Sequence, residues 1–210
     1  MTPTDFIHAA RVPESLKPQA FGPWRIERRV NRSKLWAPKL DWLCKVGFES
    51  YTLLTRYTWA TLHTDTGDVV MEDSRRELQK HLPIWLNAEG RVLVTGLGLG
   101  CVVRGLLASK RVKHITVVEI DRNILRVVGH EFKSNGRVTL VHGDALTVQI
   151  PGTFDFAWHD LWTEGETHLQ VLHAELLFRF KKQCGAQGAW ELPRWMKAQI
   201  RDAVPLLANY

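Results

Sequence analysis

Three glycines on alternate positions follow a short apolar run in the stretch "RVLVTGLGLG", residues 91–100. Because Gly96, Gly98 and Gly100 lack a Cβ, they let a ligand approach the main chain where a predicted strand turns into a predicted helix. A dinucleotide fingerprint requires Gly-x-Gly-x-x-Gly, and Cys101 departs from it, which argues against a pyrophosphate ligand. A tight structural turn is the alternative interpretation of the same glycines.

Acidic side chains lie at the ends of the three predicted strands that follow. Glu119 can accept two hydrogen bonds from vicinal ribose hydroxyls, so the glycine loop and this acid together favour a ribose-containing ligand. Asp144, in "HGDA", can accept a hydrogen bond from an adenine amino group, or it caps a helix. Asp160, in "FDFAWHD", can position or deprotonate a substrate group, or it caps a helix.

The elements that position these residues alternate between strands and helices, which predicts an α/β fold with a mostly parallel sheet wound with helices. The predicted strands are residues 91–96, 114–120, 138–145 and 154–161, and the predicted helices are residues 101–110, 121–132, 164–182 and 192–207. A helix between the third and fourth strands is missing, and "QGAWE", residues 187–191, is the sole sign of a fifth strand. We therefore expect a Rossmann-like sheet that is truncated at its C-terminal end.

The residues before this unit divide into two segments. Residues 51–63 and 68–71 are rich in Thr, Val, Leu and aromatic residues around "DTGD", which predicts a β-hairpin, and a helix that bends at Pro83 follows it. Residues 1–40 contain five prolines, and we expect them to be extended, with few helices. The predicted domains are a basic, Pro-rich extension (1–48), a hairpin with a linking helix (49–90) and a Rossmann-like cofactor-binding domain (91–210).

The charge is concentrated near the N-terminus. The chain carries a net charge of +6, and residues 1–40 hold eight basic side chains against three acidic ones. With Trp24 and Trp36 interleaved, this arm is a candidate for binding nucleic acid through its phosphates and bases. A solvated lead-in without a partner is the alternative.

Composition excludes several classes of protein. No apolar run approaches the roughly 20 residues that cross a bilayer, and the first residues lack the pattern of a secretory signal, so we expect a cytoplasmic protein with no membrane contact. Three scattered cysteines predict reduced thiols, and the histidine spacing predicts no metal site. A homo-oligomer is an open expectation, because the shortened sheet leaves the wall around the acceptor to be built by the N-terminal hairpin or by a second subunit.

The motifs "VLVTGLGLG", "VVEID", "VHGDA" and "FDFAWHD", in this order, resemble those of class I S-adenosylmethionine-dependent methyltransferases, most closely their spermidine synthase-like relatives, and also short methyltransferase-like proteins of phages. The resemblance implies a Rossmann-like methyltransferase fold and S-adenosylmethionine or its decarboxylated form as cofactor. The Asp-Pro-Pro-Tyr motif of DNA amino-methyltransferases is absent after the fourth strand.

The resemblance also implies roles for individual residues. Gly96, Gly98 and Gly100 would line the methionine and ribose moieties, and Glu119 would hold the ribose hydroxyls. Asp144 and Ala145 would bracket the adenine, and Ile120 and Asp160 complete the predicted cofactor-binding set. Asp160 is also the predicted catalytic residue, because it occupies the position of the aspartate that deprotonates the attacking amine in spermidine synthases.

The predicted function is therefore transfer of a methyl or aminopropyl group to an unknown acceptor. A non-catalytic nucleoside- or RNA-binding module is the first alternative, favoured by the short C-terminal region and the basic arm. An NAD-dependent oxidoreductase is the second, and it rests on the fold alone.

Overall fold

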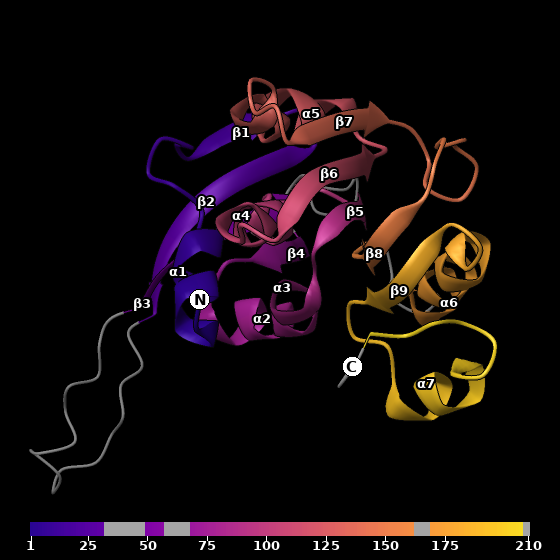
Figure 1. Ribbon diagram of the computed structural model, residues 1–210. Helices are drawn as coiled ribbons and strands as arrows, with labels where there is room; N and C mark the ends of the chain where they lie inside the picture. The colour runs from indigo at the N-terminus through magenta and orange to yellow at the C-terminus, as the bar shows by residue number, and fades with distance from the viewer. Residues whose placement is uncertain (32–48, 57–67, 162–168, 208–210) are drawn as a thin grey trace, which may run out of the picture.

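The chain forms two β-sheets with helices around them, as the computed structural model shows (Figure 1). The structure describes residues 1–31, 49–56, 68–161 and 169–207. Predictions that concern Trp36, the segment 57–67 or Cys44, the first of the three cysteines, lie outside the described residues.

The larger sheet has five strands, which are all parallel and are ordered β7-β6-β5-β8-β9. Its strands are β5 (Gly90–Thr95), β6 (Val112–Glu119), β7 (Val138–His142), β8 (Phe154–His159) and β9 (Cys184–Ala189). The strand order reverses beside β5, so the carboxyl ends of β5, β6 and β8 meet at one edge, which is where open α/β sheets bind ligands. The predicted Rossmann-like sheet is confirmed, and within the described residues it ends with the parallel strand β9.

Short connections wind the chain around this sheet. The helices in this part are α4 (Cys101–Ala108), α5 (Arg122–Val127), the 3₁₀ turn η1 (Gly129–Phe132), α6 (Leu169–Phe180) and α7 (Arg194–Ile200). Between β7 and β8 the described chain has a turn at Asp144 and no helix, as expected.

The smaller sheet is antiparallel, in the order β1-β2-β3-β4. It consists of β1 (Gln19–Phe21), β2 (Trp24–Asn31), β3 (Glu49–Arg56) and β4 (Asp68–Glu72), and the chain then continues through α2 (Arg75–Gln79) and α3 (Leu82–Asn87). The predicted hairpin is confirmed as β3 and β4, and the predicted linking helix is interrupted at Lys80 and His81, just before Pro83.

The expectation of an extended N-terminal segment with few helices agrees with strands β1 and β2 but missed helix α1 (Pro3–Ala10). This helix begins with a capping box between Thr2 and Asp5 and has Pro3 in its first turn, where a missing N–H costs nothing. Strand β2 alternates the buried Trp24 and Ile26 with more exposed neighbours and pairs with β3, so its partner lies beyond the proposed boundary at residue 48. The proposed domain boundaries themselves stay a prediction.

The two sheets share one hydrophobic core. Phe6 of α1, Trp24 of β2, Leu54 of β3 and Val92 of β5 belong to the same cluster of buried side chains. Helix α1 packs on α4, and in Figure 1 α4 lies between the N-terminal elements and the parallel sheet. The N-terminal sheet is therefore held against the ligand-binding edge by apolar burial.

A buried carboxylate adds a polar link between the N-terminal elements. Asp73, directly after β4, is 2% exposed and accepts hydrogen bonds from the backbone N–H groups of Val12 and Thr52. Arg11 lies 4.0 Å from the same carboxylate. This one side chain therefore joins the segment after α1 to β3 and β4.

We predict that Asp73→Ala lowers the free energy of unfolding by about 2 kcal/mol, because it leaves two buried backbone donors without acceptors. Urea denaturation followed by circular dichroism measures the change. Asp73→Asn keeps one carbonyl oxygen and should lose less. An alanine variant as stable as the wild type would contradict the proposed link.

Candidate functional site

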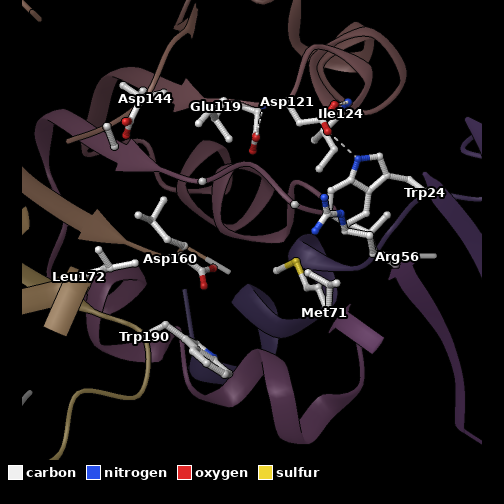
Figure 2. A pocket seen from close by; sticks show the side chains of 18 of the residues that line it. Trp24, Arg56, Met71, Glu119, Asp121, Ile124, Asp144, Asp160, Leu172 and Trp190 are labelled. Atoms are coloured by element: carbon white, nitrogen blue, oxygen red, sulfur yellow. Dashed lines mark hydrogen bonds between the residues drawn. The ribbon is translucent and has the colours of Figure 1, made fainter. Parts of the chain in front are cut away.

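A cavity of about 590 Å³ lies between the carboxyl edge of the parallel sheet and the N-terminal sheet (Figure 2). Its floor comes from the ends of β5, β6 and β8, and its roof comes from Trp24, Arg56 and Met71 of the antiparallel sheet. The volume falls within the range of roughly 300–1,000 Å³ typical of small-molecule sites.

Glu119, at the end of β6, organises the floor. Its carboxylate accepts hydrogen bonds from the backbone N–H groups of Leu97 and Asp121, both 2.8 Å long. The residue is only 6% exposed, and this burial raises the pKa of Glu119 although the backbone donors oppose the shift. Two carboxylate oxygens offer about four lone-pair sites, so acceptor capacity remains for the hydroxyls of a ribose.

Asp121 connects the floor to the roof. One of its oxygens accepts from the N–H groups of Asn123 and Ile124 and so caps α5, while the other accepts from the indole N–H of Trp24 at 2.8 Å. The guanidinium of Arg56 lies 5.5 Å from the Trp24 ring centre. Trp24 is buried in this contact and lines the cavity, so it is not part of an exposed basic arm, and stacking of its ring on nucleic-acid bases stays a prediction.

The glycine loop lies close to neighbouring protein atoms. Gly96 and Gly98 have φ angles of +91° and +49° and line the cavity. A Cβ on Gly96 would overlap the carbonyl oxygen of Asp160, and one on Gly98 would lie 2.6 Å from the Met71 sulfur. The absence of a Cβ at these two glycines therefore lets Asp160, after β8, and Met71, of β4, pack against the loop. The sequence analysis had instead explained the glycines by the close approach of a ligand.

Gly100 has a different role from the other two glycines. It is the residue before α4, with φ +79°, and it does not line the cavity. A Cβ there would lie 2.9 Å from the Phe132 ring. Gly100 therefore serves the packing of the helix start, and the predicted contact with the cofactor is not supported by its position.

The far end of the floor carries the groups predicted to surround an adenine. Ile120, Asp144 and Ala145 all line the cavity. Asp144 also accepts a hydrogen bond from the Leu146 N–H at 2.9 Å, so it stabilises the turn after β7 as well. The adenine contact is compatible with this position, whereas the predicted helix cap is wrong, because the chain forms a turn and no helix after Asp144.

Asp160 lies at the other end, where β8 leaves the sheet. Its backbone N–H bonds to the Thr95 carbonyl, and Figure 2 shows its carboxylate pointing into the cavity. Burial, assisted by the nearby charge of Glu77 and opposed by Lys80, raises the pKa of Asp160 to about 7. A carboxylate with this pKa can take up or release a proton near neutral pH.

Three further residues surround Asp160, and two of them, Glu77 and His81, were not predicted from the sequence. Glu77 and His81, from the segment of α2 and α3, and Trp190, after β9, also line the cavity. Glu77 accepts from the Trp190 indole N–H at 2.8 Å and pairs with Lys80, whose ammonium group lies 4.8 Å from the Trp190 ring centre. No spacing rule connects these residues in sequence, and only the fold brings them together.

Membrane-spanning helices and metal clusters are both absent from the described residues. None of the helices in that part of the chain is both long and apolar enough to cross a bilayer. No group of three or more His, Cys, Asp or Glu side chains among the same residues is arranged to hold a metal ion.

Comparison with known proteins supports a superfamily. A family model described as ribosomal RNA adenine dimethylase matches residues 81–175, the segment that contains Gly96, Glu119, Asp144 and Asp160. Together with the order of the parallel strands, this match supports the class I S-adenosylmethionine-dependent methyltransferase superfamily. It also supports the expected cofactor, S-adenosylmethionine.

The similar proteins share only parts of the chain. It is 34% identical over 65 residues to ribosomal RNA small subunit methyltransferase A of Prochlorococcus marinus (strain MIT 9215), a match that covers 31% of this chain and 23% of that protein. The protein of the same name from Geobacter metallireducens (strain ATCC 53774 / DSM 7210 / GS-15) is 25% identical over 95 residues, covering 45% and 34%. The matched part of the chain therefore spans about a quarter to a third of the length of these curated relatives.

The structural comparison is similarly partial. The crystal structure of the 23S rRNA methyltransferase ErmE is 20% identical, with a TM-score of 0.41, and the match covers 53% of this chain and 43% of that one. The predicted closeness to spermidine synthases is not supported by these comparisons, and neither is aminopropyl transfer. The matched relatives are named as methyltransferases.

We predict that Glu119→Ala weakens binding of S-adenosylhomocysteine at least about tenfold, because charge-assisted hydrogen bonds to the cofactor and to the loop are lost together. Isothermal titration calorimetry measures the affinity. Glu119→Gln keeps one acceptor oxygen and should be intermediate, while the exposed Glu89→Gln serves as the control. Unchanged affinity in the alanine variant would remove Glu119 from the cofactor site.

Proposed function

We propose that this protein transfers a methyl group from S-adenosylmethionine to an amino nitrogen of a nucleobase in RNA. The position of Asp160 carries the proposal, because its carboxylate faces the same cavity as Glu119, at the edge where β5 and β8 end. The match of residues 81–175 to ribosomal RNA adenine dimethylase, and the rRNA methyltransferases among its relatives, support RNA as the acceptor.

The lining of the cavity supports a specific placement of the cofactor. Glu119 would hold the ribose hydroxyls, Ile120 and Ala145 would flank the adenine, and Asp144 would accept from its amino group. Gly96 and Gly98 would lie under the methionine moiety, which directs the sulfur toward Asp160. When bound, S-adenosylmethionine supplies an electrophilic methyl group on a sulfonium.

The protein's own contribution is alignment, exclusion of water and acceptance of a proton. The roof and the floor of the cavity would hold the methyl donor and the acceptor next to each other. Such positioning increases the reaction rate by several orders of magnitude. The attacking amine becomes a cation as its bond to carbon forms, and the Asp160 carboxylate is placed to take up the released proton.

We predict that wild-type protein incorporates tritium from methyl-labelled S-adenosylmethionine into bacterial total RNA, and that Asp160→Asn lowers the rate roughly 100-fold because the proton acceptor is lost. Asp155→Asn is the matched control, because Asp155 begins the same strand outside the cavity and bonds to the Arg91 N–H. An Asp160→Asn variant with normal turnover would refute the catalytic role.

The rate should also depend on pH. Burial raises the pKa of Asp160 to about 7, and the acid must be ionised to accept a proton. We therefore predict that the methylation rate rises roughly tenfold per pH unit below about 7 and levels off above it. A profile measured between about pH 5.5 and 8.5 that stays flat in the wild type would contradict this assignment.

A non-catalytic nucleoside- or RNA-binding module is the second candidate. Leu161 follows Asp160 where DNA amino-methyltransferases have the first proline of Asp-Pro-Pro-Tyr, and this departure favours binding without chemistry. Binding of S-adenosylhomocysteine with no incorporation into RNA, DNA or protein would select this candidate.

A further inference from the structure

We propose that His81 and Asp160 form a two-point subsite that recognises an unsubstituted amino group on the methyl acceptor. The subsite rests on the proposed function and deepens it, because it specifies which chemical form of the acceptor nitrogen is bound. No motif in the sequence indicated His81.

His81 is a buried polar ring without a hydrogen-bond partner among the described residues. It precedes α3 and is only 1% exposed, yet neither of its ring nitrogens forms a hydrogen bond there. Buried polar groups in proteins are almost always paired. Because His81 also lines the cavity, a bound ligand is the natural source of the missing partner.

Two tryptophans fix the position of the His81 ring. The Trp85 ring centre lies 5.5 Å away at a tilted angle of 55°, and the Trp158 ring lies 5.9 Å away, nearly perpendicular at 80°. Both tryptophans are fully buried, so the imidazole is held in place by core packing. A ring held in this way gives a ligand a fixed hydrogen-bonding point at low entropic cost.

The distance to Asp160 fits a ligand atom between the two side chains. Nε2 of His81 lies 3.9 Å from a carboxylate oxygen of Asp160, which is too long for a direct hydrogen bond. A small polar group bound beside both side chains would contact both atoms. Burial lowers the pKa of His81 to about 3, so the ring is neutral and one of its nitrogens can accept a hydrogen bond.

These two acceptors match the two N–H groups of a primary amine. One N–H can donate to Asp160 and the other to His81 Nε2, which leaves the nitrogen lone pair free to attack. As the N–C bond forms and the C–S bond breaks, the proton that leaves the nitrogen passes to Asp160. A hydroxyl has a single donor, and a ring carbonyl has none, so neither can satisfy both partners.

The surrounding wall favours a neutral acceptor. The charge of Glu77 is balanced by Lys80 at 2.9 Å, and Lys80 also pairs with Glu191. Trp190, Leu161 and Leu172 add apolar surface to this end of the cavity. A neutral amino group on a flat, apolar body such as a nucleobase fits this lining.

The arrangement has a consequence for the product. After one methyl transfer the nitrogen keeps a single N–H, so a second transfer must proceed with only one of the two hydrogen bonds in place. We therefore expect a monomethylated amine as the main product, whereas the name of the matched family denotes two methyl groups.

Calorimetric titration with nucleosides, in the presence of saturating S-adenosylhomocysteine, tests the subsite directly. Adenosine has two N–H groups on N6, N6-methyladenosine has one, and purine riboside has none. We expect adenosine to bind about tenfold more tightly than N6-methyladenosine, and purine riboside to bind weakest. Equal binding of all three, or of none, by the wild type overturns the proposal.

Two variants assign the effect to His81. His81→Phe keeps a ring between the tryptophans and should bind adenosine and N6-methyladenosine equally, while His81→Gln retains an acceptor and should restore part of the preference. Affinity for S-adenosylhomocysteine should change less than about twofold in both. A tenfold preference that persists in His81→Phe, or a lost affinity for S-adenosylhomocysteine, places His81 outside the acceptor subsite.

Two results distinguish a failure of the proposed RNA methylation from a failure of the proposed subsite. If RNA is not methylated but adenosine binds with the expected preference, the subsite stands and the RNA acceptor is wrong. If RNA is methylated and the main product of the wild type is dimethylated, the RNA acceptor stands and the two-point subsite is wrong.

Discussion

The two backbone hydrogen bonds that Glu119 accepts hold the site together. One comes from Leu97 in the glycine loop and the other from Asp121 at the start of α5, so a single buried carboxylate fixes the loop after β5 relative to the end of β6. Asp121 then bonds to Trp24, which carries the link to the N-terminal sheet. Burial disfavours the ionised form of Glu119 and raises its pKa, and the two backbone N–H donors oppose this effect.

The N-terminal sheet completes a cavity that the parallel sheet cannot enclose alone. An open α/β sheet offers a crevice at its carboxyl edge, and the walls above it must come from other elements. Here they come from β2, β3 and β4, held by the core shared with α4 and by the buried Asp73. The N-terminal elements therefore act as part of the site, although they lie outside the segment that matches the family model.

The sequence was sufficient to predict the parallel strands and the residues at their ends. Strands buried on both faces read as apolar runs, and Glu119 and Asp160 follow such runs directly, so their positions were predictable. Helix α1 was missed because five prolines outweighed a local signal, the capping box at Thr2. His81 could not be predicted, since it and Asp160, 79 positions apart, meet only through the fold.

The lining of the cavity has the opposite charge to the chain as a whole. Five acidic residues, Glu77, Glu119, Asp121, Asp144 and Asp160, line it, and among the described lining residues Arg56 alone carries a permanent positive charge. The whole chain has a net charge of +6. A sulfonium cation is attracted to such a lining, and the uncharged thioether that remains after methyl transfer is not. Under the proposed function, the same side chains therefore attract the sulfonium of the donor more strongly than the uncharged thioether that remains after transfer.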